Sequence, residues 1–380
     1  FSEYVVKILF TNFLKGNGGG HVTYLINLLK NMSTQYECHV ASPQSSRLFR
    51  FAQAIPGVRS IAQEFSSRLP LMCVEAQQIR TLLKRERYDI VHVNGSADHR
   101  LIVLASLGLK HRPKIVFTKH NDHRLKSFGN RMRAIGTDSV IAVSQYVLSL
   151  FKDTAYEGKP IRVVYHGVDT DYFAPCDDHA FRDQQRQSLV GPEHSSLILI
   201  GSSGGTDYEK GWLEMVEAVS LLPQELRQQC RIIVAGDLPD TQKIQVLVDL
   251  GIQDSVIFPG LLDDVRPTLL ACDLGFVLSH KEALSFACRE SMSLGLPTIV
   301  SDAGGLPENI RHQENGWIVP VKNPQVLAQL LSEILPNTAL RQKIGDAARK
   351  TAENEFNLRL FTQNTLLCYD EVLQHKRHSR

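Results

Sequence analysis

The chain has 380 residues, a formal net charge of +2, 43% apolar residues and 22% charged residues. This composition excludes a disordered or collagen-like chain and is ordinary for a folded globular protein. The length exceeds the size at which a single hydrophobic core usually stops growing, so two domains are expected.

Seven cysteines are scattered along the chain and never form a C-x-x-C pair. The pattern favours neither a disulfide framework nor a zinc cluster, and a reducing compartment fits best. No apolar run reaches the roughly 18 residues that span a bilayer. No charged-then-apolar leader with a cleavage site is recognised in the printed sequence. We therefore expect a cytoplasmic protein.

The charge is unevenly placed. Residues 1–170 contain 23 Lys and Arg against 12 Asp and Glu, whereas the remainder contains 19 against 28. A basic first half favours an anionic partner, either a membrane surface or a phosphorylated acceptor. Attraction between two lobes, or chance, explains the asymmetry equally well.

Short β-branched runs alternate with amphipathic stretches from end to end, which predicts parallel sheets built from strand–helix–strand units. The predicted strands are 5–10, 37–42, 89–94, 114–120, 139–144 and 162–167, followed by 196–202, 231–237, 256–261, 274–279 and 297–302. Helices are predicted at 21–33, 210–222 and 356–373. The expected fold class is α/β, with two doubly wound, Rossmann-like domains facing a cleft.

The domain boundary is expected near residue 170, where turn residues and Pro175 precede a polar stretch, 176–195, that lacks apolar periodicity. Residues 1–170, with the C-terminal helix at about 360–380 crossing back, form the predicted acceptor-binding domain. Residues 171–359 form the predicted donor-binding domain. Closure of such a cleft would exclude water from a two-substrate transfer reaction.

Three consecutive glycines, Gly18–Gly20, lie between the first strand and its helix. They let the backbone approach a ligand, and the helix start offers N–H groups to an anion, so a phosphate site is one reading and a tight turn is the other. A similar junction, residues 201–211, places Lys210 near a helix start, where it can reach a diphosphate. Lys210 is otherwise an ordinary surface lysine.

Two carboxylates, Glu282 and Glu290, stand eight positions apart in an otherwise apolar strand-to-helix unit. Ser285 is the predicted N-cap of a helix that ends near Leu294. Because a carboxylate accepts two hydrogen bonds side by side, two spaced acids suit the vicinal hydroxyls of a ribose and of a second sugar. The backbone amides near Leu284, Ser285 and Phe286 suit the phosphates between those rings. Solvated surface acids are the alternative.

The ordered motifs resemble the retaining glycosyltransferases of family 4, which have the GT-B fold. Their pattern E-x7-E, small-x-Gly-x-Pro-x-[IV], GG-x-x-E is matched by Glu282, Glu290, Gly295, Pro297, Gly304, Gly305 and Glu308. The resemblance also takes in Gly18–Gly20, His166–Asp169 with Phe173, Lys210-Gly211, 235–237, 256–260, 314–316 and the terminal helix. It covers nearly the whole chain.

The resemblance implies a nucleotide-diphosphate sugar as co-substrate and neither cofactor nor metal. It implies that Glu290 binds ribose, Glu282 the donor sugar and Lys210 the diphosphate, with His120 beside the donor sugar. The implied catalytic residues are therefore His120, Lys210 and Glu282. The implied donor-binding residues are Gly19, Gly20, Ser202, Lys210, Leu284, Ser285, Phe286 and Glu290. The implied chemistry is same-face substitution, in which a diphosphate oxygen takes the acceptor proton.

The sequence departs from the family pattern in two places. Ser202 and Ser203 stand where relatives carry an arginine, so one diphosphate cation is missing, and Arg266 or Arg289 is a candidate replacement. Residues 283–286 read ALSF where many relatives have G-F-G-L. The lost glycines restrict the backbone near the donor.

A basic segment with interleaved apolar residues, 119–136, lies in the first half. Its cations are Lys119, Arg124, Lys126, Arg131 and Arg133. They suit contact with an anionic membrane at its inner face, or with a phosphorylated saccharide or glycolipid acceptor of the lipopolysaccharide type. A solvated helix face is the alternative.

Two other functions stay open. A sugar-nucleotide 2-epimerase also uses two doubly wound domains but needs no acceptor. A nucleotide-sugar-binding protein with weak catalysis fits the missing arginine. Nucleic acid is not an expected partner, because no recognised binding module is present.

Overall fold

The computed structural model describes residues 5–125 and 127–377. Contacts divide the chain into two compact units. The first contains the residues up to Gly167 and from Leu358 onward, and the second contains Val168–Asn357. Each unit is an α/β domain around its own parallel sheet, so the predicted α/β class with two doubly wound domains is confirmed. The chain changes unit at Gly167, three residues before the expected boundary.

The sheet of the first domain has the order β3-β2-β1-β4-β5-β6-β7, and all its neighbours pair in parallel. Its strands are β1 (Lys7–Thr11), β2 (Glu37–Ser42), β3 (Val58–Ala62), β4 (Ile90–Val93), β5 (Lys114–Lys119), β6 (Ser139–Ala142) and β7 (Ile161–Val163). Strand order reverses between β1 and β4. Ligands of doubly wound sheets bind beyond the carboxyl ends of the strands at such a point.

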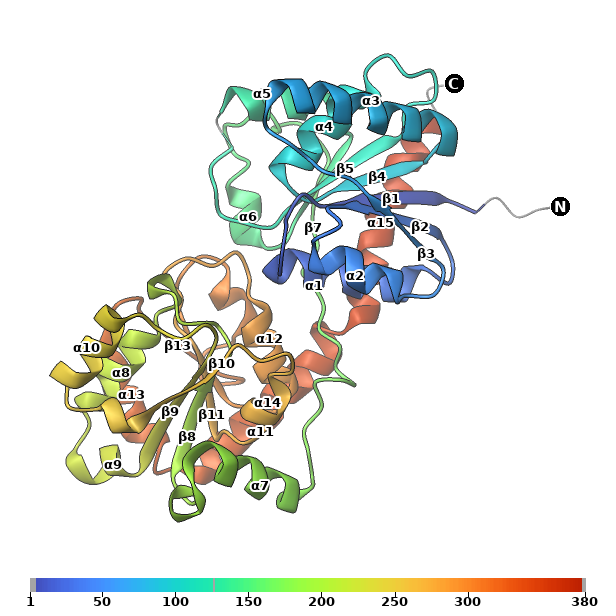
Figure 1. Cartoon of the computed structure of the whole chain (residues 1–380). Coiled ribbons are helices and arrows are strands. Elements are labelled where there is room, and N and C mark those ends of the chain that lie inside the picture. The colour runs from blue at the N-terminus through green and yellow to red at the C-terminus, as the bar shows by residue number, and fades with distance from the viewer. Residues whose placement is uncertain (1–4, 126, 378–380) are drawn as a thin grey trace. The chain divides into compact units, whose positions relative to one another are not determined.

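Helices cover both faces of this sheet (Figure 1). The helices are α1 (Gly19–Met32), α2 (Arg47–Gln53), α3 (Leu69–Glu86), α4 (Ser96–Ser106), α5 (Phe128–Gly136), α6 (Gln145–Ser149) and α15 (Leu358–Arg377). α1 contacts α2 and α15, whereas α4 contacts α3 and α5. α15 is tied to the sheet by the Tyr369 hydroxyl, 2.6 Å from Nδ1 of His92, and by Cys368, 3.3 Å from Ser139.

The second sheet repeats this topology, with the order β10-β9-β8-β11-β12-β13. Its strands are β8 (Ile198–Ser202), β9 (Cys230–Ala235), β10 (Val256–Gly260), β11 (Leu274–Val277), β12 (Thr298–Ser301) and β13 (Trp317–Val319). Here strand order reverses between β8 and β11. The second domain therefore has its own ligand-binding edge.

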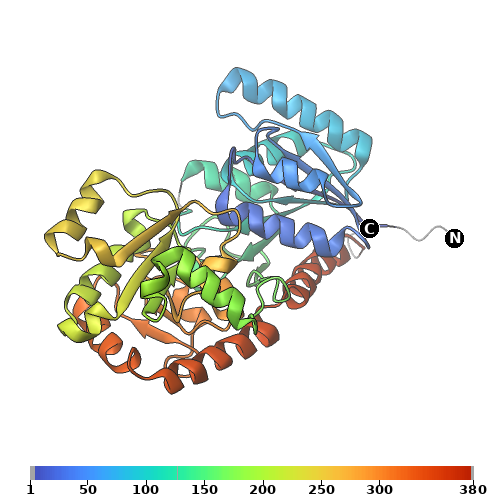
Figure 2. The ribbon, with the colours of Figure 1, turned by 60° about the horizontal axis from the view of Figure 1, so that its bottom comes forward.

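The helices of the second domain also lie on both faces of their sheet (Figure 2). They are α7 (His179–Val190), α8 (Trp212–Ser220), α9 (Gln224–Gln228), α10 (Thr241–Asp249), α11 (Arg266–Leu270), α12 (Phe286–Ser293), α13 (Pro324–Ile334) and α14 (Thr338–Glu355), with 3-10 turns η1 (Pro192–His194), η2 (Tyr208–Lys210), η3 (Gln253–Ser255) and η4 (Leu306–Asn309). A core that includes Trp212, Phe276 and Leu331 joins α8 and α13 to the sheet. Cys288, Val300 and Ala348 belong to a separate core on α12, β12 and α14.

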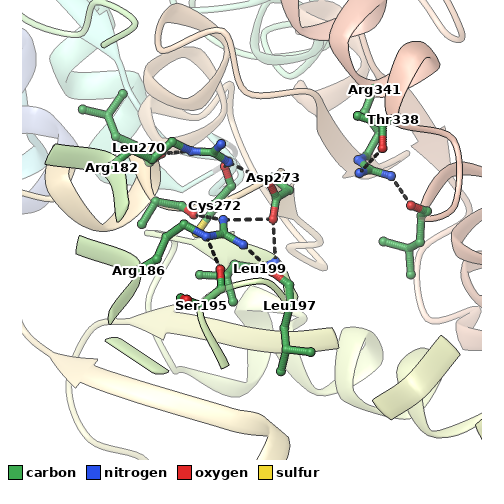
Figure 3. A network of polar contacts seen from close by, with 12 residues as sticks. Arg182, Arg186, Ser195, Leu197, Leu199, Leu270, Cys272, Asp273, Thr338 and Arg341 are labelled. Atoms are coloured by element: carbon green, nitrogen blue, oxygen red, sulfur yellow. Dashed lines mark hydrogen bonds and ion pairs between the residues drawn. The ribbon is translucent and has the colours of Figure 1, made fainter. Parts of the chain in front are cut away.

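The polar stretch 176–195, for which the sequence predicted no helix, contains helix α7. Asp178 caps this helix by accepting from the Phe181 amide at 3.1 Å. Arg186, only 6% exposed, donates to the carbonyl of Ser195 at 2.8 Å and to Asp273 at 3.1 Å (Figure 3). Charge-assisted hydrogen bonds of Arg182 and Arg186 to Asp273 hold the middle of α7, and its end packs into an apolar core through Leu189 and Val190.

Two strands are missing from the sequence prediction. β3 is only half buried along its length, and β13 has three residues, so neither forms an apolar run. None of the described helices is long and apolar enough to cross a bilayer.

Candidate functional site

The loop between β8 and α8 packs tightly against the end of β11 in the second domain. Gly211 has a φ of +70°, and a Cβ on it would lie 1.9 Å from the carbonyl oxygen of Leu278. Only glycine permits this approach. The main-chain amide of His280 donates to the carbonyl of Glu209 at 2.8 Å and fixes the two loops together.

This packing brings Lys210 and Glu282 into contact. The Lys210 Nζ lies 3.5 Å from Oε2 of Glu282, and the Ser279 hydroxyl lies 3.3 Å from the same oxygen. The side chains of Lys210 and Glu282 remain 35% and 20% exposed, so both are accessible to a ligand. A cation that binds phosphate and a carboxylate that binds hydroxyls therefore stand side by side at the carboxyl edge of the second sheet.

Helix α12 begins directly after this pair. Ser285 is its N-cap, and the Ser285 hydroxyl accepts from the Cys288 amide at 3.3 Å. Ser285 has a φ of +96°, a conformation that residues with a side chain rarely adopt. The backbone thus keeps the left-handed geometry for which glycine is suited, although the sequence has serine.

The loop that carries Glu282 is supported from behind. The Gly305 amide donates to the Glu282 carbonyl at 2.9 Å, and the Asn309 side chain donates to the Leu284 carbonyl at 2.7 Å. The Ser301 hydroxyl donates to the Ser279 carbonyl at 2.6 Å. These bonds place the start of α12, where Leu284, Ser285 and Phe286 lie, at the same edge as Lys210. Helix starts favour negatively charged ligands.

Glu290 lies on the second turn of α12 and is half buried. Ser202 ends β8, is 5% exposed, and accepts from the Gly204 amide at 3.1 Å. The two candidate replacements for the missing arginine are engaged elsewhere. Arg266 binds Asp264 at 2.6 Å and stacks on Tyr172, whereas Arg289 is buried over the Phe356 ring and donates to Asn309. The structure therefore supports neither replacement.

In the first domain, the glycine loop joins β1 to α1. Gly18 and Gly19 have φ values of +67° and +50°, and a Cβ on Gly18 would lie 2.3 Å from the Val22 side chain. Gly19 and Gly20 are exposed at the start of α1. His21 follows and stacks on His120, with ring centroids 4.3 Å apart.

His120 follows β5 and contacts Asn94, which follows β4. The side-chain nitrogen of Asn94 donates to the carbonyls of Thr11 and His92, both at 3.2 Å. The Asn94 oxygen therefore faces His120, and Nε2 of His120 donates to it at 2.9 Å. The proton on Nε2 leaves Nδ1 of His120 as the hydrogen-bond acceptor of the neutral ring.

Burial keeps this histidine group neutral. It lowers the pKa of His120 well below its ordinary value, with the neighbouring histidines adding repulsion. Burial also lowers the pKa of His21 to about 4 and that of His92 to about 3. At neutral pH these rings donate and accept hydrogen bonds without carrying charge.

The basic segment separates into two groups. Lys119, Arg124 and Arg133 line a cavity of about 500 Å³ beside His120 and His21. Arg131 instead lies exposed on α5 and does not line this cavity. Lys126 lies outside the described residues.

The predicted site residues thus fall into two places. Ser202, Lys210, Glu282, Leu284, Ser285, Phe286 and Glu290 belong to the second domain, and Gly19, Gly20, Lys119, His120, Arg124 and Arg133 belong to the first. Sequence reasoning missed Asn94, His21 and Ser279. Asn94 and Ser279 each follow a buried strand closely, and a polar residue in that position was the available signal.

Both domains match glycosyltransferase family models. Residues 18–172 match the model described as Glycosyltransferase Family 4, and residues 182–351 match the one described as Glycosyl transferases group 1.

Three curated relatives are similar over different shares of the chain. N-acetyl-alpha-D-glucosaminyl L-malate synthase from Bacillus anthracis is 26% identical over 80% of this chain and 80% of its own. D-inositol 3-phosphate glycosyltransferase from Salinispora arenicola is 30% identical over 59% of this chain and 54% of its own. The lipopolysaccharide core biosynthesis glycosyltransferase LpsE from Rhizobium meliloti is 22% identical over 93% and 96%.

Solved structures share the fold. A glycosyltransferase from Rickettsia africae superposes with a TM-score of 0.85 at 23% identity, covering 97% of this chain and 99% of its own. HepE from Anabaena, solved in complex with UDP, gives a TM-score of 0.81 at 19% identity, covering 97% and 100%.

Proposed function

Because the chain belongs to the glycosyltransferases with the GT-B fold, we propose that it is a retaining, hexosyltransferase-type enzyme of family 4. It moves a sugar from a nucleotide-diphosphate sugar to a saccharide or lipid-linked acceptor. The observation that carries the proposal is the contact of Lys210 with Glu282 at the edge of the second sheet, 3.5 Å apart and beside the start of α12.

In this proposal Lys210 and the α12 start bind the donor diphosphate, and both favour the charge that develops as it leaves. Glu282, freed from Lys210, accepts from the sugar hydroxyls, while Glu290 accepts from the ribose. A diphosphate oxygen takes the proton of the attacking acceptor on the same face, so the anomeric configuration is kept. The positive groups of the protein perform the role that a metal ion has in other transferases, so we expect no metal requirement.

His120 has a separate role in the proposed reaction. Its neutral ring presents Nδ1 as an acceptor, which suits a sugar hydroxyl and not the negatively charged diphosphate. The glycine loop at Gly19 and Gly20 supplies backbone N–H groups to the donor phosphates, as helix starts commonly do.

The test begins with a thermal-shift screen of UDP, GDP, ADP and their sugars. A ligand at 100 times its dissociation constant adds about 2.7 kcal/mol to the free energy of unfolding. The bound nucleotide sugar is then incubated with saccharides, with and without EDTA, and the anomeric configuration of the product is read by NMR. Inversion, or loss of activity in EDTA, would contradict the mechanism. Conversion of the nucleotide sugar to its C2 epimer without an acceptor would show epimerisation instead.

One relative supports a proposal for the acceptor class. LpsE is named for lipopolysaccharide core biosynthesis and aligns over 93% of this chain. We therefore propose that the acceptor is a saccharide or glycolipid of polysaccharide or lipopolysaccharide biosynthesis, and that the reaction takes place in the cytoplasm. Turnover of lipopolysaccharide core fragments, with neutral disaccharides in parallel, tests this class.

Helix α5 suits contact with the inner face of the cytoplasmic membrane. Phe128, Met132 and Ile135 are 76%, 51% and 73% exposed, and their spacing places them on one face. Arg131 is exposed on the same helix. Apolar residues beside cations bind anionic bilayers.

We expect the double variant Phe128→Ser, Ile135→Ser to lose its sedimentation with phosphatidylglycerol vesicles. Leu261 is an exposed leucine of the second domain, so Leu261→Ser should leave sedimentation unchanged. Equal sedimentation of all three proteins, or with neutral vesicles, would exclude this contact.

A further inference from the structure

The cavity beside His120 is polar and positively charged. Its volume of about 500 Å³ lies within the range of small-molecule sites, about 300–1,000 Å³. Phe13, Phe117 and Leu125 give it apolar walls, and Lys119, Arg124 and Arg133 give it three cations. None of the described residues that line it is an aspartate or a glutamate.

Lys119 is the most buried of these cations. It is 4% exposed, and its ammonium group donates to the amide oxygen of Asn121, a neutral acceptor. Asp122 attracts it from a longer range. A buried cation is unfavourable unless an anion compensates it, and a single amide oxygen does so only weakly.

Arg133 likewise has neutral partners on the cavity wall. Its guanidinium group donates to the Asn130 side chain at 2.6 Å and to the Ser96 carbonyl at 3.4 Å. Arg124 is exposed at the cavity. The lining therefore gathers three positive charges without contributing a negative charge of its own. Lysine and arginine arranged in this way bind phosphates and carboxylates.

We propose that this cavity, the anion pocket, binds an anionic group of the acceptor, a phosphate monoester or a carboxylate, through Lys119, Arg124 and Arg133. The inference rests on the proposed function and deepens it by assigning a charge to the acceptor. The bound anion neutralises the buried ammonium of Lys119. The remainder of the acceptor then lies near His120 and His21, which share the cavity wall.

The pocket also has an expected pH dependence. Burial lowers the pKa of Lys119 to about 8. The amine is therefore charged below pH 8 and loses its proton above it. A bound anion raises the pKa of Lys119 in the complex. Anion affinity therefore falls as the pH rises from about 8 toward that higher value.

Calorimetric titration tests the pocket directly. Inorganic phosphate and L-malate are titrated in separate arms at pH 7 into the full chain, saturated with whichever nucleotide stabilises it. We expect binding of at least one anion, weakened at least tenfold by Lys119→Met. Lys152→Met is the matched control, because Lys152 is an exposed lysine of the same domain and does not line the cavity. Equal affinity in Lys119→Met and wild type, or binding of neither anion, would overturn the proposal.

Turnover distinguishes the source of the anion. Nucleotide release is measured with sugar phosphates, sugar acids and detergent-solubilised lipid-linked phosphosaccharides, each paired with its neutral counterpart. We expect the anionic member of at least one pair to have a kcat/KM at least tenfold higher, and Lys119→Met to remove that preference by raising KM. A preference that survives in Lys119→Met contradicts the pocket. Hydrogen exchange of the β4 and β5 amides, unchanged from wild type, shows that the first domain of the variant is folded. Absence of nucleotide binding in wild type would instead refute the proposed function.

Discussion

The side-chain oxygen of Asn94 lies 2.9 Å from Nε2 of His120, where β4 and β5 of the first sheet end. The amide of Asn94 is held by the carbonyls of Thr11 and His92, so it fixes both the orientation and the tautomer of His120. Asn94 is therefore a positioning residue for the proposed reaction.

Replacement of Asn94 tests this role. We expect Asn94→Leu to lower kcat about 10- to 100-fold with a small change in donor KM, because the correct tautomer is no longer enforced. In Asn94→Asp a carboxylate stabilises the imidazolium form, so the pKa of His120 rises and activity is lost at a higher pH on the acid side. An unchanged pH profile in Asn94→Asp would show that Asn94 acts only in packing.

The two acids of the second domain are expected to differ in effect. Glu290→Gln should weaken nucleotide binding by about 1–3 kcal/mol, because a ribose hydroxyl loses a charged acceptor. Glu282→Gln should leave nucleotide affinity nearly unchanged and lower kcat. Calorimetry with the free nucleotide and initial rates with its sugar separate the two. Similar, small effects of both changes would contradict the assignment.

Most strands of both sheets could be predicted from the sequence, because parallel strands that are buried on both faces consist of continuous apolar runs. The exceptions are β3, which is half buried and mixes apolar with polar residues, and β13, whose apolar run of three residues ends at Pro320. The contact of Lys210 with Glu282 was not predicted, because the two were assigned to different parts of the donor. It depends on β8 and β11 being neighbours in the sheet.

Other features of the candidate site were harder to predict. The positive φ of Ser285 contradicts the preference of serine, and its one signal was the glycine that the G-F-G-L of many relatives has at this position. The separation of Arg131 from Lys119 and Arg133 depends on which face of α5 and which strand end each occupies. A basic segment in sequence does not reveal that division.

Ser285 offers a stability test. Ser285→Gly removes a strain of about 1–3 kcal/mol, while glycine at an N-cap costs only a few tenths of a kcal/mol. We expect it to stabilise the second domain by about 1 kcal/mol. Ser285→Ala keeps the strain and loses the hydrogen bond to Cys288, so it should destabilise by about 1 kcal/mol. Urea unfolding of wild type, Ser285→Gly and Ser285→Ala gives their free energies of unfolding. If Ser285→Gly is the least stable of the three, the backbone at Ser285 is not strained.

The buried histidines predict that the first domain loses stability in mild acid. Burial lowers the pKa of His21 to about 4 and of His92 to about 3, and it lowers the pKa of His99 well below its ordinary value. The folded state keeps them neutral, whereas the unfolded chain binds protons below about pH 6.5. Their contribution is therefore complete above pH 6.5 and is lost as the pH falls toward the folded pKa values. Each histidine contributes a slope of about 1.4 kcal/mol per pH unit.

His99→Phe isolates one of these groups. The ring of His99 already packs on Phe117, with centroids 4.6 Å apart, so phenylalanine fits the surroundings while removing the titration. The hydrogen bond to Thr137 is lost, which lowers stability at every pH and leaves the slope as the informative quantity. We expect the slope of unfolding free energy between pH 6 and 5, from hydrogen exchange of the β4 and β5 amides, to fall by about 1.4 kcal/mol per pH unit. His111→Phe, at an exposed position, should leave it unchanged. An equal slope in wild type and His99→Phe would mean that His99 is protonated in the folded domain.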